Sequence, residues 1–118
     1  VNAGSTASAS APRIVYFDFD SYTIKDEYRG LIESSARALA GARSKRMTVE
    51  GHTDERGGRE YNLALGQKRA ETVARAMALL GVNADQVEAV SFGKERPAAQ
   101  GSDEAAWAKN RRAEIKEK

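Results

Sequence analysis

Two charged side chains, the carboxylate of Asp54 and the guanidinium of Arg69, stand where a polar loop meets the start of a helix. The loop follows a short apolar run that ends in Val49-Glu50-Gly51-His52. A carboxylate can bind an ammonium group and a guanidinium can bind a carboxylate, so this pair suits a ligand that carries both. The same pair makes a poor catalyst, because an arginine favours the ionised form of nearby carboxylates and leaves no general acid.

Further polar residues are dense around this pair. They are His52, Thr53, Glu55, Arg56 and Asn62. Such residues in a loop between regular elements mark a binding site more often than a core. The alternative is a structural ion pair that fastens the loop to the helix, and the residue types alone do not decide between the two.

Catalytic and metal sites have little support in the sequence. His52 is the only histidine and there is no cysteine, so no zinc ligand set exists, and we expect His52 to be a hydrogen-bonded structural residue. Asp18 and Asp20 would point the same way on an extended segment, but no third carboxylate is near them in sequence. Gly57-Gly58 lacks the Lys-Ser/Thr of a phosphate-binding loop. We therefore expect no enzyme activity, no metal and no cofactor.

Hydrophobic periodicity predicts four strands and two main helices. The strands are expected at 14–17, 47–50, 86–92 and 112–116, the helices at 24–39 and 59–80, and one or two helical turns at 103–109. The first strand is apolar on both faces, which predicts a central strand. Gly41 and Gly81 are expected to end the two main helices.

This order predicts a two-layer α/β (α+β) sandwich, a βαβαβ-β mixed sheet with both main helices on one face. Ligands gather at the carboxyl ends of strands, where loops meet helix N-termini. If the first two strands are parallel neighbours, the loops that carry Asp20 and Asp54 open on the same edge. Asn62 and Arg69 lie two helical turns apart on one face, and Arg69 can reach back toward the loop. We expect a polar notch in which Asp20 and Asp54 face Arg69, with free helix N–H groups available to a carboxylate.

Length and composition predict one domain at 13–118, preceded by a flexible tether at 1–12. The tether is small, polar and uncharged. The formal net charge of +2 decides little about partners, and the basic cluster Lys109, Arg111 and Arg112 lacks interleaved aromatics, so we expect no nucleic-acid partner. No apolar run approaches membrane-spanning length.

Long ordered motifs resemble the OmpA-like peptidoglycan-binding domain. They are Phe17-Asp18-Phe19-Asp20, Glu50 to Gly57, Glu60 to Gly66, Arg69-Ala70 and Gly81-Val82. Two further segments, 90–97 and 103–113, resemble the peptidoglycan-associated lipoproteins (the Pal group) within that family. The resemblance covers nearly everything after Arg13.

The resemblance implies a periplasmic domain that binds the peptidoglycan stem peptide without covalent chemistry. The ligand in this family is the free end of the diaminopimelate side chain, a zwitterion. Asp54 would bind its ammonium and Arg69 its carboxylate. The remaining implied site residues are Phe19 and Asp20 as first-loop contacts, Asn62 and Arg111 as orienting groups, and Thr53 and Arg56 as weaker candidates.

The resemblance also implies partners and a location. Pal-like proteins dock the TolB propeller through an overlapping surface, and a lipidated N-terminal cysteine anchors them to the periplasmic face of the Gram-negative outer membrane. This chain has no cysteine, so the anchor would lie upstream and 1–12 would be part of its tether. The implied role is to tether outer membrane to cell wall in the Tol-Pal envelope system. The alternatives are an OmpA-like domain of a porin or flagellar stator, or a cell-wall hydrolase acting through Asp18, Asp20 or His52.

Overall fold

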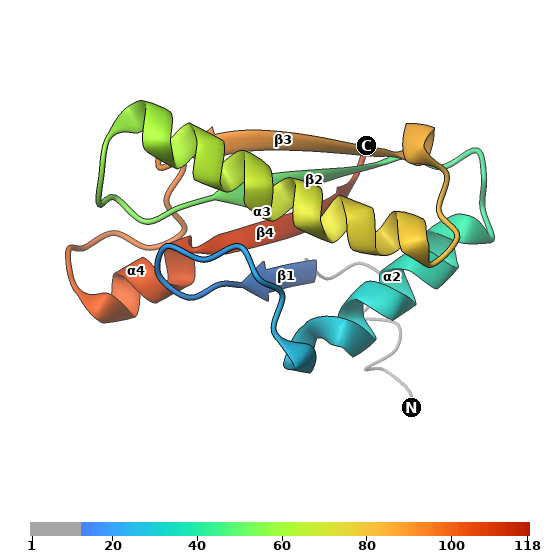
Figure 1. Ribbon diagram of the computed structural model, residues 1–118, viewed down its shortest axis with the longest axis horizontal. Helices are drawn as coiled ribbons and strands as arrows, with labels where there is room; N and C mark the ends of the chain where they lie inside the picture. Colours follow the sequence, from blue (N-terminus) through green and yellow to red (C-terminus); the bar gives the residue numbers. More distant parts are fainter. Residues whose placement is uncertain (1–12) are drawn as a thin grey trace.

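A computed structural model describes residues 13–118, so the predicted tether at 1–12 lies outside the described residues. The described chain contains a four-stranded sheet, three α-helices and two short 3-10 turns (Figure 1). The elements in chain order are β1 (Arg13–Tyr16), η1 (Asp26–Tyr28), α2 (Arg29–Ala40), β2 (Met47–His52), α3 (Arg59–Leu79), η2 (Ala84–Gln86), β3 (Val87–Gly93), α4 (Glu104–Asn110) and β4 (Arg112–Glu117).

The sheet has the strand order β1-β4-β2-β3. β4 is antiparallel to both β1 and β2, and β2 is parallel to β3. The prediction that β1 is a central strand was therefore wrong, because β1 lies at an edge and β4 separates it from β2. Its outward Tyr16 ring packs instead against Tyr28 of η1, with ring centroids 6.5 Å apart. β1 and β2 nevertheless run in the same direction, so the loops after them open at the same end of the sheet.

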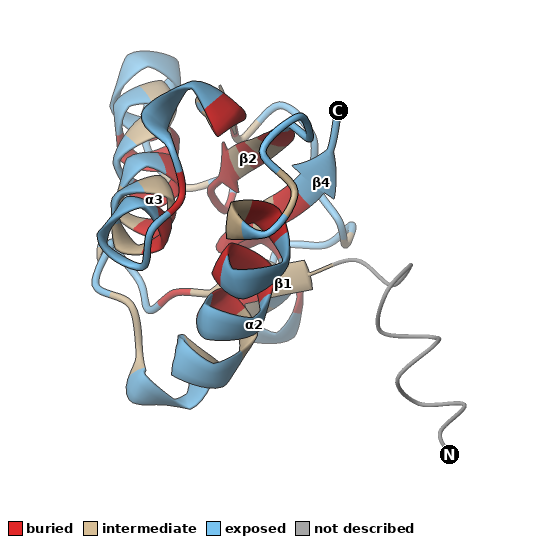
Figure 2. Cartoon of the chain, turned by 90° about the vertical axis from the view of Figure 1, so that its right-hand side faces the viewer, coloured by how far each residue is buried: buried red, intermediate tan, exposed pale blue. Residues whose placement is uncertain are grey.

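Both main helices cover one face of the sheet, as the sequence predicted (Figures 1 and 2). Figure 2 shows the buried residues of both helices on the sides that face the sheet. These residues form one hydrophobic cluster with buried residues of the strands. The cluster includes Val15, Val49 and Ile115 from the sheet, Ile32, Ala36 and Leu39 from α2, and Ala70, Val73 and Met77 from α3. The two-layer sandwich is thus confirmed.

Two glycines set the distance between α3 and the sheet. A Cβ placed on Gly51 of β2 would lie 1.7 Å from the carbonyl oxygen of Gly66, and one on Gly66 would lie 2.3 Å from Oγ of Ser91. No larger residue fits such an approach without moving the helix. Since Arg69 follows Gly66 by one helical turn, this contact also fixes where Arg69 meets the end of β2.

The helix ends differ from each other. Gly81, after α3, has φ 105° and is the left-handed residue that the sequence predicted. Gly41 also stands at the end of its helix, but with φ −80° it ends α2 without a left-handed turn. No helix in the range 13–118 is both long enough and apolar enough to cross a membrane.

Candidate functional site

Three loops meet at the end of the sheet where β1, β2 and β3 finish, because these strands run in the same direction. Between the first two loops and the start of α3 lies a small cavity, called the notch below. Its lining residues are Phe19, Asp20, Thr53, Asp54, Arg56, Tyr61, Asn62, Leu65 and Arg69. The lining of the notch therefore contains every predicted site residue except Arg111. Arg111 lies outside the lining but contacts the carboxylate of Asp54.

Arg69 is completely buried at the base of the notch. Its guanidinium donates hydrogen bonds to three backbone carbonyls, those of Ser21 (2.8 Å), His52 (2.9 Å) and Asp18 (3.1 Å). Burial lowers the pKa of Arg69 to about 10, so the side chain is still charged at neutral pH. Arg69 thus fastens the loop after β1 to the end of β2, and it is not within ion-pair distance of Asp54, unlike the loop-to-helix pair considered from the sequence.

Asp54 forms its ion pairs with two other arginines. Its carboxylate accepts hydrogen bonds from Nε (3.2 Å), Nη2 (2.8 Å) and the backbone N–H (3.0 Å) of Arg56. Nη1 of Arg111 lies 3.5 Å from Oδ2. Burial raises the pKa of Asp54, but the hydrogen bonds and charge of Arg56 and the bond from Arg111 outweigh it, so the pKa lies below its ordinary value. Asp54 is therefore ionised and cannot serve as a general acid.

The guanidinium of Arg56 lies between two aromatic rings. Its central carbon is 4.1 Å from the ring centroid of Phe19 and 4.0 Å from that of Trp107. Trp107 also donates from its indole nitrogen to Glu55 at 2.9 Å. Cation–π contacts of this kind hold a guanidinium at a fixed height over the ring. Trp107 thus holds Arg56 beside the notch.

Side chains from α3 and the loop after β3 hold the β2–α3 loop in place. Nδ2 of Asn62 donates to the carbonyl of Arg56 at 2.9 Å, and Nζ of Lys94 donates to the carbonyl of Gly57, also at 2.9 Å. The hydroxyl of Thr53 donates to the carbonyl of Asp54 at 3.0 Å. Asn62 therefore fixes the position of the loop that carries Asp54 through a hydrogen bond to its backbone.

The loop after β1 forms the outer rim. Phe19 has 59% of its surface exposed, and Tyr61 from α3 has 50%. Asp20 is exposed and has φ 56°, a left-handed conformation that Asp adopts more readily than most residues. Phe19 and Tyr61 thus place two exposed aromatic rings at the rim of the notch.

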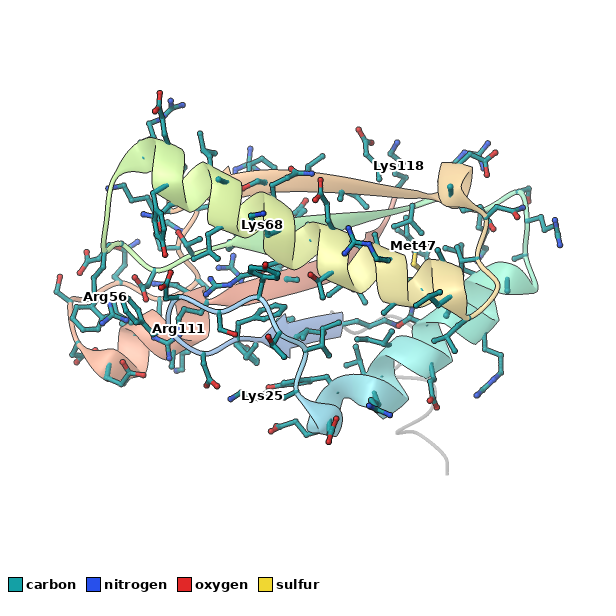
Figure 3. All side chains as sticks on the ribbon, in the orientation of Figure 1. Lys25, Met47, Arg56, Lys68, Arg111 and Lys118 are labelled. Atoms are coloured by element: carbon teal, nitrogen blue, oxygen red, sulfur yellow. The ribbon has the colours of Figure 1, made fainter. Side chains whose placement is uncertain are left out.

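Arg111 and Arg112 point to opposite sides of the sheet. Arg111 donates to the carbonyl of Phe17 at 2.9 Å and to Glu104 at 2.8 Å, in addition to its contact with Asp54. Arg112 is paired with Glu114 on the other side. Figure 3 places Arg111 and Arg56 together beside α4. Both Arg111 and Arg112 are buried, so the basic cluster seen in the sequence is not an open positive surface.

His52 does not line the notch. Its ring is 1% exposed and stacks on Phe92 with centroids 5.6 Å apart. Neither ring nitrogen has a hydrogen-bond partner, and the nearest carboxylate oxygen, on Glu50, is 3.6 Å from Nε2. The sequence had predicted a hydrogen-bonded structural residue, whereas the structure shows a buried ring held by packing. Desolvation, together with the charge of Arg112, lowers its pKa to about 4.

Carboxylates are scattered rather than grouped at this end of the sheet. Asp18 is exposed and pairs with Lys25 at 2.8 Å, so it does not face Asp20 as a dyad would. Within residues 13–118, no group of three or more His, Asp or Glu side chains could hold a metal ion.

No site role was predicted from the sequence for Tyr61, Leu65 or Trp107. Leu65 could have been found from helical spacing, since it lies three residues after Asn62 and four before Arg69. Trp107 is the only tryptophan and stands in a polar segment, but its contact with Arg56 joins residues 51 positions apart that no local pattern connects.

The fold and the notch define a class of protein. The sequence profile of the OmpA family matches residues 16–111, so the chain belongs to the OmpA family. The match runs from the last residue of β1 to just past the end of α4 and includes the whole lining of the notch.

Within that family, the chain is similar in sequence to several proteins named peptidoglycan-associated lipoprotein. It is 48% identical over 116 residues to the peptidoglycan-associated lipoprotein of Pseudomonas aeruginosa, covering 96% of this chain and 68% of that protein. The relative from Pasteurella multocida is 50% identical, with 84% and 66% covered. The chain thus spans about two thirds of the length of these relatives.

Two solved structures give the corresponding comparison in three dimensions. The crystal structure of the peptidoglycan-associated lipoprotein from Burkholderia pseudomallei superposes with a TM-score of 0.89 at 56% identity, covering 90% of each chain. The C-terminal domain of Helicobacter pylori MotB has a TM-score of 0.81 at 25% identity, covering 92% of this chain and 84% of that one.

Proposed function

We propose that this domain binds peptidoglycan non-covalently and so tethers the outer membrane to the cell wall. The single observation that carries the proposal is the notch, in which the buried carboxylate of Asp54 and the buried guanidinium of Arg69 lie beneath an aromatic rim. Relatives named for their association with peptidoglycan share 48–56% of its residues, which supports the same role here.

The ligand we propose is the free end of the diaminopimelate side chain in the stem peptide. This group carries an ammonium and a carboxylate on one carbon. Asp54 supplies the negative charge for the ammonium, and Asp20 is a second carboxylate at the exposed rim. The positive charges are those of Arg56, Arg69 and the adjacent Arg111. Charge-assisted hydrogen bonds in a partly desolvated notch are strong enough to hold such a small group.

The hydrogen bonds of Arg69 bear on the role proposed for it. Three of its N–H groups are used by backbone carbonyls, which leaves its two remaining N–H groups for a ligand carboxylate. We propose that Arg69 contributes a fixed positive potential and these remaining donors. Phe19, Asp20 and Thr53 supply rim and backbone contacts, while Asn62 and Arg111 hold the Asp54 loop in position.

The test is co-sedimentation of the chain with purified sacculi. Asp54→Asn keeps the side-chain shape but removes the charge, and we expect it to weaken binding by roughly 1.5–3 kcal/mol, the value of a hydrogen bond to a charged group. Asp26→Asn is the matched control, since Asp26 is exposed on η1 and pairs only with Arg29 among the described ion pairs. Equal sedimentation of Asp54→Asn and wild type would refute the site.

Analysis of the supernatants from the same co-sedimentation experiment for soluble muropeptides distinguishes binding from hydrolysis. We propose that the domain is not an enzyme, because Asp54 is held ionised by arginines and His52 is buried away from the notch. Soluble muropeptides released from sacculi would support the hydrolase instead. Intact sacculi that carry bound protein agree with the binding module.

We also propose the partners and location implied by the Pal resemblance. The domain would face the periplasm from the outer membrane, held by a lipid anchor upstream of this chain, and would dock a TolB-like propeller over the rim of the notch. The identity of 48–56% to peptidoglycan-associated lipoproteins favours this host over a porin or a flagellar stator. Competition between a TolB-like protein and stem peptide for the domain tests the shared surface, and simultaneous binding would contradict it.

A further inference from the structure

The notch is almost completely filled by its own side chains. Its free volume is about 10 Å³, which is room for about one water molecule. An ammonium and a carboxylate on one carbon need several times that space. A side chain must therefore move before the proposed ligand can enter.

Asp54 has no acceptor site to spare. A carboxylate offers about four lone-pair positions. Oδ1 accepts from the backbone N–H and from Nε of Arg56, and Oδ2 accepts from Nη2 of Arg56 and from Nη1 of Arg111. An incoming ammonium can bond to Asp54 only where one of these donors leaves.

Arg56 is the donor that can leave. Its side chain is 32% exposed, whereas that of Arg111 is 8% exposed and is also bonded to the carbonyl of Phe17. Both side-chain hydrogen bonds of Arg56 go to Asp54. Its other side-chain contacts are the rings of Phe19 and Trp107, which involve no hydrogen bond and can persist when the guanidinium moves off Asp54.

We propose that Arg56 is an exchangeable internal cation: the ligand's ammonium replaces its guanidinium on Asp54, and the released guanidinium binds the ligand's carboxylate. This inference rests on the proposed function. It explains selectivity for a zwitterion. An amine alone takes from Arg56 its hydrogen-bonded counter-ion and leaves it only the charges of Glu55 and Glu104. A carboxylate alone meets an Arg56 already neutralised by Asp54, and only a ligand with both groups replaces the ion pair that it breaks.

Binding of two small probes to the 118-residue chain tests the exchange. The probes are meso-diaminopimelate and pentylamine, which has a similar carbon chain and an ammonium but no carboxylate. In Arg56→Ala, Asp54 has lost its internal competitor, so pentylamine should bind about tenfold more tightly than in wild type, while meso-diaminopimelate should bind about tenfold more weakly. Arg59→Ala is the control, because it removes the same charge from an exposed neighbour that pairs with Glu95. It should change neither affinity.

Opposite changes for the two probes are specific to exchange. If Arg56 were only a contact for the carboxylate, pentylamine binding would not change. If it only stabilised the loop, both probes would bind more weakly. Either result would overturn the proposal.

The Nε–H resonances of arginine give a direct second readout. As meso-diaminopimelate saturates wild type, the Arg56 signal should shift as its bond to Asp54 breaks, while that of Arg69, which donates to Ser21, should stay near its starting position. Saturation at the Asp54 amide with an unmoved Arg56 signal would refute exchange but leave the proposed function standing. Absence of any binding by wild type would remove the proposed function and the exchange with it.

Discussion

Arg69 joins the loop after β1 to the end of β2 through three backbone carbonyls, and this makes its side chain part of the framework of the notch as well as part of its lining. Asp54 is held in a similar way, by two arginines from different elements. At the scale of single residues, the charges that would meet a ligand are thus also the charges that hold the loops together. Loss of binding in a variant must therefore be separated from loss of structure.

Arg69→Lys is expected to destabilise the fold. A lysine ammonium cannot reach three carbonyls set around a planar guanidinium, so at least one buried carbonyl loses its donor. We predict a loss of roughly 2–4 kcal/mol in the free energy of unfolding, measured by urea titration. Arg75→Lys, on an exposed position of the same helix, is the control and should change stability little. Equal stability of wild type and Arg69→Lys would show that the three bonds contribute nothing net.

His52 should make stability depend on pH. In the unfolded chain His52 takes up its proton near pH 6.5, its ordinary value, whereas burial lowers the pKa in the folded protein to about 4. Between these values the unfolded state binds more protons, so stability falls as pH falls from 6.5 to 4. The charged groups around the ring are Glu50 on β2 and Arg112 and Glu114 on β4.

His52→Phe removes that dependence and preserves the stacking on Phe92. The difference in unfolding free energy between the variant and wild type should shift in favour of the variant as pH is lowered from 7 to 4.5. Carboxylates that titrate in this range are common to both proteins and cancel in the difference. A difference that stays constant across this range would contradict a buried neutral His52.

At the scale of elements, the contact between β2 and α3 positions the notch. Gly51 and Gly66 allow the helix backbone to touch the strand, and the next turn of the helix places Arg69 under the end of β2. The bulge between Gly51 and His52 falls at the same point, where β2 leaves the regular ladder with β3. The packing of these two elements and the geometry of the site are therefore linked.

Gly51→Ala tests this link. The new methyl group would overlap the carbonyl of Gly66, and we predict a loss of about 3 kcal/mol or more in unfolding free energy. Gly30→Ala is the matched control, because nothing lies within 4 Å of its added methyl group and the site is helical. That change should stabilise the protein by about 0.5–1 kcal/mol. Thermal unfolding of both variants measures the contrast, and a tolerated Gly51→Ala would refute it.

Sequence patterns predict the individual helices and strands, but not the order of the strands or the contacts between distant segments. The helix at 59–80 was predicted from helical spacing, which is a local pattern, and Ala70, Val73 and Met77 at that spacing are buried in the core. The apolar run at 14–17 predicted a central strand, yet β1 is an edge strand, because strand order depends on where β4 inserts. Likewise Asp54 and Arg69 could be placed near one another, but the choice of Arg56 and Arg111 as partners of Asp54 depends on contacts between distant segments.

At the scale of the whole molecule, the notch lies at the end of the sheet opposite to the point where the chain enters β1. Arg13 begins β1, and the loop that carries Phe19 and Asp20 leaves its other end (Figure 1). A chain held by its N-terminal side therefore presents the notch away from the point of attachment. This arrangement suits a domain proposed to reach from a membrane to the cell wall.

The central claim is that the notch recognises a zwitterion, and one NMR titration tests it most directly. The ¹⁵N-labelled chain is titrated with a stem peptide that contains meso-diaminopimelate, and with the same peptide carrying L-lysine, which keeps the ammonium and lacks the carboxylate. We predict saturable shifts at Phe19, Asp20, Thr53, Asp54 and Asn62, with the lysine peptide bound about tenfold or more weakly. Equal binding of the two peptides, or saturable binding that leaves these residues unshifted, would contradict the claim.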